Sequence, residues 1–351
     1  MDLTELSSIK WTKQEILIMI KTAEFVSLGH PDKIADFITS YILDRLIEQD
    51  CSVRYGVEVM VKDNTIVLGG EVCGNVRLSK LEEYVKNALR TIGYNEKYAE
   101  IWGDKAININ KVQVINLISC QSSEIAQGVD NDGWGDQGVF VGYATKGEGF
   151  INRELFLSRK LNRALYEKAR YSDNLGLDIK TQITIDENDK ILTAIVAIPM
   201  INDENLDDFI CNVLGNKPQK LIINGTGKYT CHSSVADCGI TGRKLACDFY
   251  STACAVGGGS PWTKDASKAD LTLNLYARYL AVENLNDNDE VWVYLSSCIG
   301  KHELPSAVIK YRKGTEFGEK NLIIDARPSV LIKKFGLDKP VFSDLCINGI
   351  I

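Results

Sequence analysis

The stretch VRYGVEVMVKDNTIVLGGEV at residues 53–72 decides the fold. Apolar residues alternate with other residues on both sides of Asp63-Asn64, a pair typical of a turn, so the stretch predicts a β-hairpin. Helical periodicity precedes the hairpin at about residues 31–49 and follows it at about 79–91, and an apolar run at 112–118 predicts another strand. We therefore predict one unit of helix, hairpin, helix and strand.

The same order of elements returns twice along the chain. The second round predicts a helix, a hairpin, a helix and a strand at residues 153–170, 181–185 with 191–198, 204–214 and 221–223. The third predicts a helix, two strands and a helix at residues 267–283, 291–296, 307–311 and 321–335. Three copies spaced by roughly 110 to 130 residues predict a threefold internal repeat. Chance alternation in a mixed protein is the alternative.

The repeats predict the fold class. Each copy is expected to pack helices on one face of a mixed β-sheet, which gives an α+β fold of three similar α/β repeats. We place the first repeat at residues 1–125, the central repeat at 126–225 and the C-terminal repeat at 226–351.

Composition excludes several classes of protein. The chain has 351 residues, of which 45% are apolar and 25% charged, as in an ordinary globular protein of two or three domains. A net charge of −7 argues against sequence-independent binding to nucleic acid. No uncharged apolar run reaches the roughly 18 to 20 residues of a membrane span. The first 25 residues lack the pattern of a signal peptide, so we expect a cytoplasmic protein with neither nucleic acid nor membrane as partner.

The cysteines carry no functional signal. There are ten of them, with no Cys-x-x-Cys pair, and only three histidines are available for a Cys/His zinc site. We expect reduced, buried thiols.

Three glycine-rich and charged segments interrupt the repeats, and function is expected there. The first, residues 27–33, opens a helix with Pro31 in its first turn, where backbone N–H groups favour anions. His30 and Lys33 are suited to hold phosphate oxygens, and Asp32 a Mg²⁺ ion. An ordinary helix start, in which Asp32 only balances the helix dipole, is the alternative.

The other two segments are richer in glycine. GWGDQG at residues 133–138 predicts a backbone that approaches a ligand closely or moves, with a plain turn as the alternative. Residues 224–270 combine a loop of three glycines at 257–259 with a basic cluster made of Arg243, Lys244, Lys264 and Lys268. The Walker A spacing is absent. A glycine loop and lysines beside a helix start still predict phosphate binding, against the alternative of solvated surface lysines.

Together the motifs resemble those of the S-adenosylmethionine synthetase family. Seven of them occur in the family's order between about residues 22 and 330: GHPDKIAD at 29–36, GGE at 69–71 preceded by Glu58, GWGDQG at 133–138, DIKTQIT at 178–184, DCGITGRK at 237–244, the glycine loop ending at Lys264-Asp265, and Ser267-Lys268-x-Asp270. The resemblance implies three α/β repeats around a pseudo-threefold axis. In the family the domains are interleaved, so the boundaries given above are approximate.

The resemblance also implies the reaction. The sulfur of L-methionine attacks C5′ of ATP, and the triphosphate leaves and is hydrolysed, giving S-adenosylmethionine, phosphate and pyrophosphate. A thioether has no proton to lose, so this step needs no general base; the charged leaving group has to be stabilised by Mg²⁺ and fixed cations. The family further implies two Mg²⁺ ions, K⁺, and a homodimer or tetramer with sites at the dimer interface.

The resemblance implies a role for each matching residue. ATP would be bound by His30, Asp178, Lys180, Lys228, Tyr229, Asp237, Arg243, Lys244, Ser260 and Lys264. The catalytic set would comprise His30, Lys180, Arg243, Lys264 and Asp136. Methionine would be bound by Glu71, Gln127, Asp237 and Lys268. Asp32 and Asp270 would be Mg²⁺ ligands and Glu58 a K⁺ ligand.

The chain also departs from the family pattern. Only two residues separate Asp130 from Gly133, which is a short active-site loop, and the family's C-terminal tail is not recognisable after about Phe335. Other replacements are Phe25, Leu28, Gly225, Lys228 and the segment 231–236. Two alternatives therefore stay open: a catalytically inactive nucleotide-binding or regulatory homologue, and a related triphosphatase.

Overall fold

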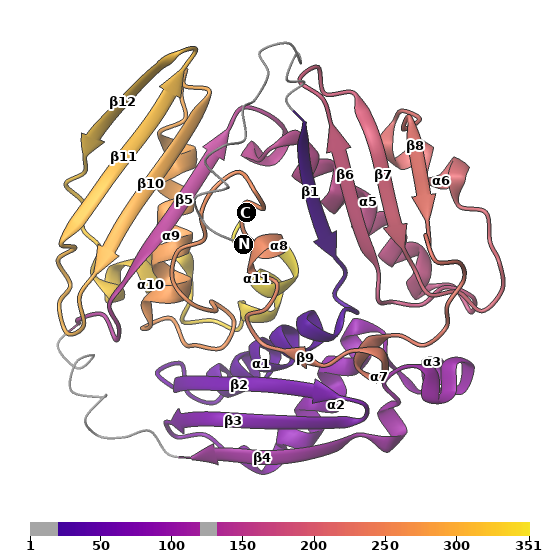
Figure 1. Ribbon diagram of the computed structural model, residues 1–351. Helices are drawn as coiled ribbons and strands as arrows, with labels where there is room; N and C mark the ends of the chain where they lie inside the picture. Colours follow the sequence, from indigo (N-terminus) through magenta and orange to yellow (C-terminus); the bar gives the residue numbers. More distant parts are fainter. Residues whose placement is uncertain (1–19, 120–131) are drawn as a thin grey trace, which may run out of the picture.

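The structure is a computed structural model that describes residues 20–119 and 132–351. The described strands form three four-stranded sheets. In Figure 1 these sheets lie along the three sides of a triangle, and helices lie in its middle. This arrangement confirms the α+β fold of three similar α/β repeats.

The first sheet is built on the hairpin that decided the fold. Its strand order is β4-β3-β2-β9, with β2 and β3 antiparallel and β3 and β4 parallel. The strands are β2 (Arg54–Lys62), β3 (Thr65–Cys73), β4 (Gln113–Ser119) and the short β9 (Gly239–Ile240). The helices of this repeat are α1 (Pro31–Ile47), α2 (Leu81–Ile92) and α3 (Glu96–Trp102), and α1 packs on the inner face of the sheet.

The other two sheets repeat this plan. One has the order β1-β6-β7-β8 and consists of β1 (Lys21–Val26), β6 (Lys180–Ile185), β7 (Ile191–Ala197) and β8 (Lys220–Ile223), with helices α5 (Arg153–Arg170) and α6 (Asp207–Leu214). The other has the order β12-β11-β10-β5 and is antiparallel throughout. It consists of β5 (Gly138–Thr145), β10 (Glu290–Ser297), β11 (Ser306–Lys313) and β12 (Glu316–Asn321), with α9 (Ala269–Glu283) and α10 (Pro328–Phe335).

Each sheet contains one strand from a distant part of the chain. β1 pairs with β6, β5 with β10, and β9 with β2. The chain therefore crosses between the sheets five times, and the domain divisions at residues 125 and 225 stay a prediction.

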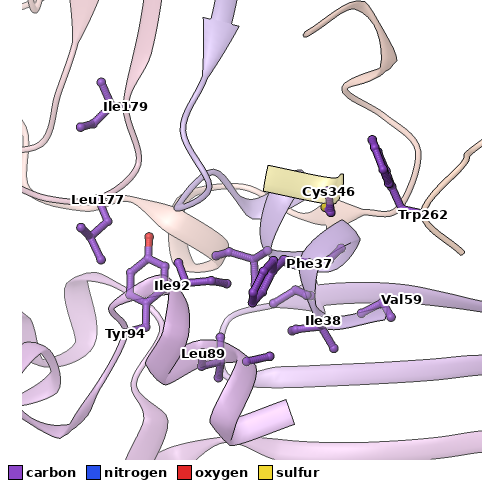
Figure 2. Packing of buried hydrophobic residues seen from close by; sticks show 14 of the residues in the cluster. Phe37, Ile38, Val59, Leu89, Ile92, Tyr94, Leu177, Ile179, Trp262 and Cys346 are labelled. Carbon is purple, nitrogen blue, oxygen red and sulfur yellow. The ribbon is translucent and has the colours of Figure 1, made fainter. Parts of the chain in front are cut away.

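The middle of the triangle is filled by apolar side chains and by the C-terminal helix α11 (Phe342–Asn348). Figure 2 shows Phe37 and Ile38 of α1, Val59 of β2 and Cys346 of α11 in this core. Asp44 of α1 accepts hydrogen bonds from the backbone N–H groups of Phe342 (2.8 Å) and Ser343 (2.9 Å), which caps α11. α11 is thus fixed against α1 by polar as well as apolar contacts.

Several sequence-based assignments need correction. Strands β1, β5, β9 and β12 were not predicted; β1 and β9 are short, and β5, although eight residues long, begins inside a glycine-rich segment. The helix predicted at residues 321–335 is shorter, because β12 runs to Asn321 and α10 begins only at Pro328. A proline disfavours helical backbone at the residue before it, and Arg327 is extended with φ −61° and ψ 134°.

Two absences concern only residues 20–119 and 132–351. The nine cysteines in these ranges are free thiols, four of them of intermediate exposure, two buried and three exposed, so burial was predicted for too many of them. No helix there is long and apolar enough to cross a bilayer.

Candidate active site

Asp32 lies at the centre of the first group of predicted site residues. It is the second residue of α1, and its carboxylate is 0% exposed. Its Oδ1 accepts a hydrogen bond from the backbone N–H of Ile240 in β9 at 2.9 Å. β9 can approach α1 this closely because residue 239 is glycine: a Cβ there would lie 2.1 Å from the carbonyl oxygen of Pro31.

Two cations reach Asp32 from the turn after β9. Lys244 Nζ lies 2.5 Å from Asp32 Oδ2, and Arg243 Nε lies 3.7 Å from Oδ1. The turn is held from beneath by Asp36, one helical turn after Asp32, whose Oδ1 accepts the N–H of Gly242 at 2.8 Å. α1 therefore positions the turn that carries both predicted phosphate-binding cations.

His30 precedes α1 and is buried beside this pair. Its Nδ1 accepts a hydrogen bond from the N–H of Asp32 at 3.2 Å, so the imidazole caps the helix. Burial and the nearby cations Lys244 and Lys180 lower the pKa of His30 to about 3. The ring is neutral at physiological pH and can donate a hydrogen bond from its other nitrogen to an anion.

Asp178 and Asp237 complete the first group. Asp178 Oδ2 accepts the backbone N–H of Ser233 at 3.0 Å, whereas its Oδ1 is buried and has no hydrogen-bond partner among the described residues. Burial raises the pKa of Asp178 to about 6, opposed by that hydrogen bond and by the charge of Lys180. Asp237 is exposed, and its charge acts on both Asp178 and His30.

The second group surrounds Gly56 on β2. Gly56 pairs with Glu71 across the hairpin and forms an isolated bridge with Lys264 on its other side. The ammonium of Lys268 lies where a side chain at position 56 would stand, 2.5 Å from the Cβ position, and donates to Tyr55 O at 3.1 Å. Glycine at position 56 thus leaves room for the lysine that the resemblance assigns to methionine.

Asp270 belongs to the second group and repeats the geometry of Asp32. It is the second residue of α9, its Oδ1 accepts the N–H of Gly259 at 2.7 Å, and its Oδ2 binds the ammonium of Lys264. The two groups meet where Gly242 lies against Ser260, since a Cβ at Gly242 would lie 2.9 Å from that of Ser260.

Four predicted site residues make none of the contacts described above. Tyr229 is near Asp178, whose charge raises the pKa of the phenol after the larger effect of burial. Lys228 Nζ instead donates to Ile201 O at 3.1 Å, which directs its charge elsewhere. Asp136 is exposed, and its Oδ1 accepts the N–H of the adjacent Gln137. Gln127 lies outside the described residues.

The sequence-based interpretation of Lys33 as a phosphate-binding residue needs correction. The residue was expected to hold phosphate, but it is buried, and its ammonium lies 2.7 Å from Asp248 Oδ1 and 3.2 Å from Asp36 Oδ2. Asp248, in the short helix α8 (Leu245–Asp248), also accepts the indole N–H of Trp262 at 2.8 Å. Lys33 therefore joins α1 to the segments that carry Lys244 and Lys264, and is not available to a ligand.

Sequence reasoning missed other partners of the site. The hydroxyl of Thr241 donates to the carboxylate of Glu58, and Thr241 N donates to Val59 O at 3.1 Å. Asp36 stands inside the GHPDKIAD motif without an assigned role; its place in that motif, one helical turn after Asp32, is the signal that could have found it.

The donor set fits Mg²⁺ bound together with phosphate. No group of three or more His, Cys, Asp or Glu side chains within residues 20–119 and 132–351 is arranged as a metal site. Mg²⁺ commonly binds through one or two carboxylates, with substrate phosphates and water completing its shell. Asp32 and Asp270 offer single carboxylates of this kind, each beside a lysine that can turn to a phosphate.

Comparisons with known proteins show which family this chain resembles along its length. Residues 18–123 match the family model described as S-adenosylmethionine synthetase, N-terminal domain, and residues 231–351 match the model of its C-terminal domain. The chain is 32% identical over 362 residues to an S-adenosylmethionine synthase from Mesoplasma florum, covering 93% of each protein. It is 30% identical to the solved structure of an unusual S-adenosylmethionine synthetase from Campylobacter jejuni, with a TM-score of 0.82 over 95% of this chain and 94% of that one. The chain therefore belongs to the S-adenosylmethionine synthetase family.

Proposed function

We propose that the protein is a methionine adenosyltransferase that makes S-adenosylmethionine, phosphate and pyrophosphate from ATP, L-methionine and water. The observation that carries this proposal is the pairing of Asp32 with Lys244 and Arg243 beside the neutral imidazole of His30. These groups converge at the start of a 17-residue helix, where backbone N–H groups also favour an anion. The arrangement suits the triphosphate of ATP.

The chemistry asks the protein to stabilise a leaving group. When the methionine sulfur attacks C5′, negative charge grows on the triphosphate oxygen that departs. Lys180, Arg243, Lys244 and Lys264 would face this charge, and His30 would donate a hydrogen bond to it. Lys264 binds the carboxylate of Asp270, which positions its ammonium beside the proposed phosphate site.

Two Mg²⁺ ions and one K⁺ are the proposed cofactors. Asp32 and Asp270 would hold Mg²⁺, which neutralises charge on the triphosphate, and Glu58 would hold K⁺. Asp178 and Tyr229 would contact the adenosine, with Ser260, Lys228 and Asp237 along the nucleotide. Glu71, Gln127, Asp237 and Lys268 would bind methionine, and Asp136 would lie near the reacting atoms.

We also propose that two copies of the chain associate through the outer face of the first sheet. The register of β2, β3 and β4 puts Glu58, Met60, Glu71, Ile115 and Leu117 on one face. Met60, Ile115 and Leu117 are 41%, 46% and 63% exposed, an apolar patch that a partner would cover. Because Glu58 and Glu71 share this face, a dimer formed there would bring predicted ligand-binding residues to its interface.

The test is an assay with ATP, L-methionine, Mg²⁺ and K⁺ read by mass spectrometry and phosphate analysis. S-adenosylmethionine with one phosphate and one pyrophosphate per turnover is expected. ATP cleavage without a sulfonium product would favour a triphosphatase, and nucleotide binding without chemistry would favour an inactive homologue. Light scattering tests the dimer, and a monomer at assay concentrations would contradict it.

A further inference from the structure

One of the segments that depart from the family pattern, residues 231–236, places a buried histidine behind Asp178. His232, in the segment 231–236, is 1% exposed, and its ring lies against Trp102 with the centroids 4.7 Å apart and the planes at 79°. His232 Nδ1 lies 2.7 Å from Thr230 O, and Nε2 lies 2.5 Å from the hydroxyl oxygen of Tyr98. Both ring nitrogens are therefore engaged.

The partner atoms decide which atom donates in each of these hydrogen bonds. The carbonyl oxygen of Thr230 can only accept, so Nδ1 of His232 carries the proton and Nε2 accepts. Tyr98 then donates its hydroxyl proton to Nε2, and its oxygen is left to accept the backbone N–H of Leu177 at 3.2 Å. Burial lowers the pKa of His232 to about 4, so the ring keeps this neutral form at physiological pH.

The chain of bonds ends on both sides of Asp178. Leu177 is the preceding residue, and Ser233, the residue after His232, donates its N–H to Asp178 Oδ2 at 3.0 Å. Ser233 has φ 58°, a left-handed conformation that is costly for a residue with a side chain. The backbone N–H of His232 donates to Lys105 O at 2.8 Å, which holds Ser233 from its other side.

We propose that Tyr98 and His232 form a positioning pair that holds the Asp178 carboxylate in place for the nucleoside of ATP. The inference rests on the proposed function. Asp178 Oδ1, which is buried and has no hydrogen-bond partner among the described residues, is the atom left for a donor on the nucleoside, either a ribose hydroxyl or the adenine amino group. Neither Tyr98 nor His232 needs to touch the substrate.

Two single variants and their combination test the pair. Tyr98→Phe removes the hydroxyl that accepts from Leu177, and His232→Phe keeps a ring but removes both nitrogens. Each is expected to weaken the binding of Mg²⁺ and the β,γ-imido analogue of ATP about tenfold, because one buried donor loses its partner. The KM for methionine should change by less than about twofold, since Glu71 and Lys268 lie in the other group.

The double variant tests whether the two residues act together. If the pair is one chain of hydrogen bonds, Tyr98→Phe with His232→Phe should bind nucleotide no worse than the weaker single variant. Losses that multiply would overturn the proposal. ITP and the 2′- and 3′-deoxy forms of ATP identify the donor: wild type should discriminate against one of them, and Tyr98→Phe should discriminate less.

Tyr250→Phe is the matched control for stability. Tyr250 is also buried and donates to Val141 O at 3.3 Å, away from Asp178. Equal weakening of nucleotide binding by this variant, or normal binding by Tyr98→Phe, would show that the pair is merely structural. If His232→Phe does not fold, the Tyr98→Phe data and the analogue series still decide. Wild type that binds nucleotide but forms no S-adenosylmethionine would refute the proposed function separately.

Discussion

Two acid–lysine pairs at the starts of two helices invite comparison. Asp32 and Asp270 are each the second residue of their helix. Each accepts a backbone N–H through Oδ1 and binds a lysine through Oδ2: Ile240 and Lys244 for Asp32, Gly259 and Lys264 for Asp270. The internal repeat thus extends from the fold to the candidate active site.

The pairs differ in what surrounds them. Asp32 is 0% exposed and lies near Arg243 as well as Lys244, whereas Asp270 is 6% exposed and pairs with Lys264 alone. Asp32 also has the imidazole of His30 beside it. In the proposed function, the first helix start would therefore be the more concentrated phosphate site, and the second would supply a single lysine.

A third acid–lysine group, Lys33 with Asp36 and Asp248, is buried and serves only the structure of the protein. Its loss should have the largest effect, which is on stability. Lys33→Met leaves Asp36 and Asp248 buried without their cation, so the free energy of unfolding should fall by about 3–5 kcal/mol. Urea denaturation measures the change. Lys86→Ala, which removes the exposed partner of Glu82 on α2, is the control and should leave stability nearly unchanged.

Removing the lysine from either site pair separates ligand binding from structure. Lys264→Ala and Lys244→Ala should each lower kcat for S-adenosylmethionine formation by about 100-fold or more, because each loses one preorganised donor to the triphosphate. Thermal unfolding should move far less than in Lys33→Met. Turnover at the wild-type rate in Lys264→Ala would remove that residue from the catalytic set and break the equivalence of the pairs.

The pH dependence of the KM for ATP tests the role of the Asp178 carboxylate near the Asp32–Lys244 pair. Burial raises the pKa of Asp178 to about 6, so the acceptor form increases as pH rises from 5 to 7. The KM for ATP should fall about tenfold across this range, and Asp178→Asn should flatten the profile. His30, with a pKa of about 3, stays neutral throughout and contributes no slope. A steep profile retained in Asp178→Asn would contradict the assignment.

A buried acid that forms no ion pair with the described residues gives the smallest effect. The carboxylate of Asp44 accepts the N–H groups of Phe342 and Ser343 and the hydroxyl of Ser343. Asp44→Ala should cost about 1 kcal/mol of stability through the lost helix cap, with both KM values unchanged. Chemical denaturation and steady-state kinetics on the same preparation check this, and a raised KM would place α11 in communication with the site.

The fold was predictable where periodicity is strong. The helix expected at residues 153–170 is α5 at Arg153–Arg170, and the hairpin at 53–72 is β2 and β3. β1 and β5 could not be found, because a six-residue strand and a strand rich in glycine give weak patterns, and their partners lie some 150 residues away. Local patterns identify strands but not the sheets that they join.

The residues of the candidate site were predictable from motifs, but the contacts among them were not. The sequence indicates that Asp32, Arg243 and Lys244 share a site. It cannot distinguish a lysine that binds a ligand from one that forms a buried ion pair within the protein. Lys33 and Lys244 differ in burial and partner, which only tertiary packing decides. His232 gives no signal beyond its departure from the family pattern, since its role depends on Tyr98, 134 residues earlier.

The exchange of strands between sheets has a consequence for how the chain folds. β1 can pair only after β6 has been synthesised, β5 only after β10, and β2 gains its partner β9 late as well. None of the three sheets is therefore complete until most of the chain has been synthesised. Contacts of such long sequence separation slow folding, and they expose unpaired strand edges in the meantime. A nascent chain released before residue 290 would lack partners for β5, so fragments of this protein are expected to aggregate and not to fold as separate domains.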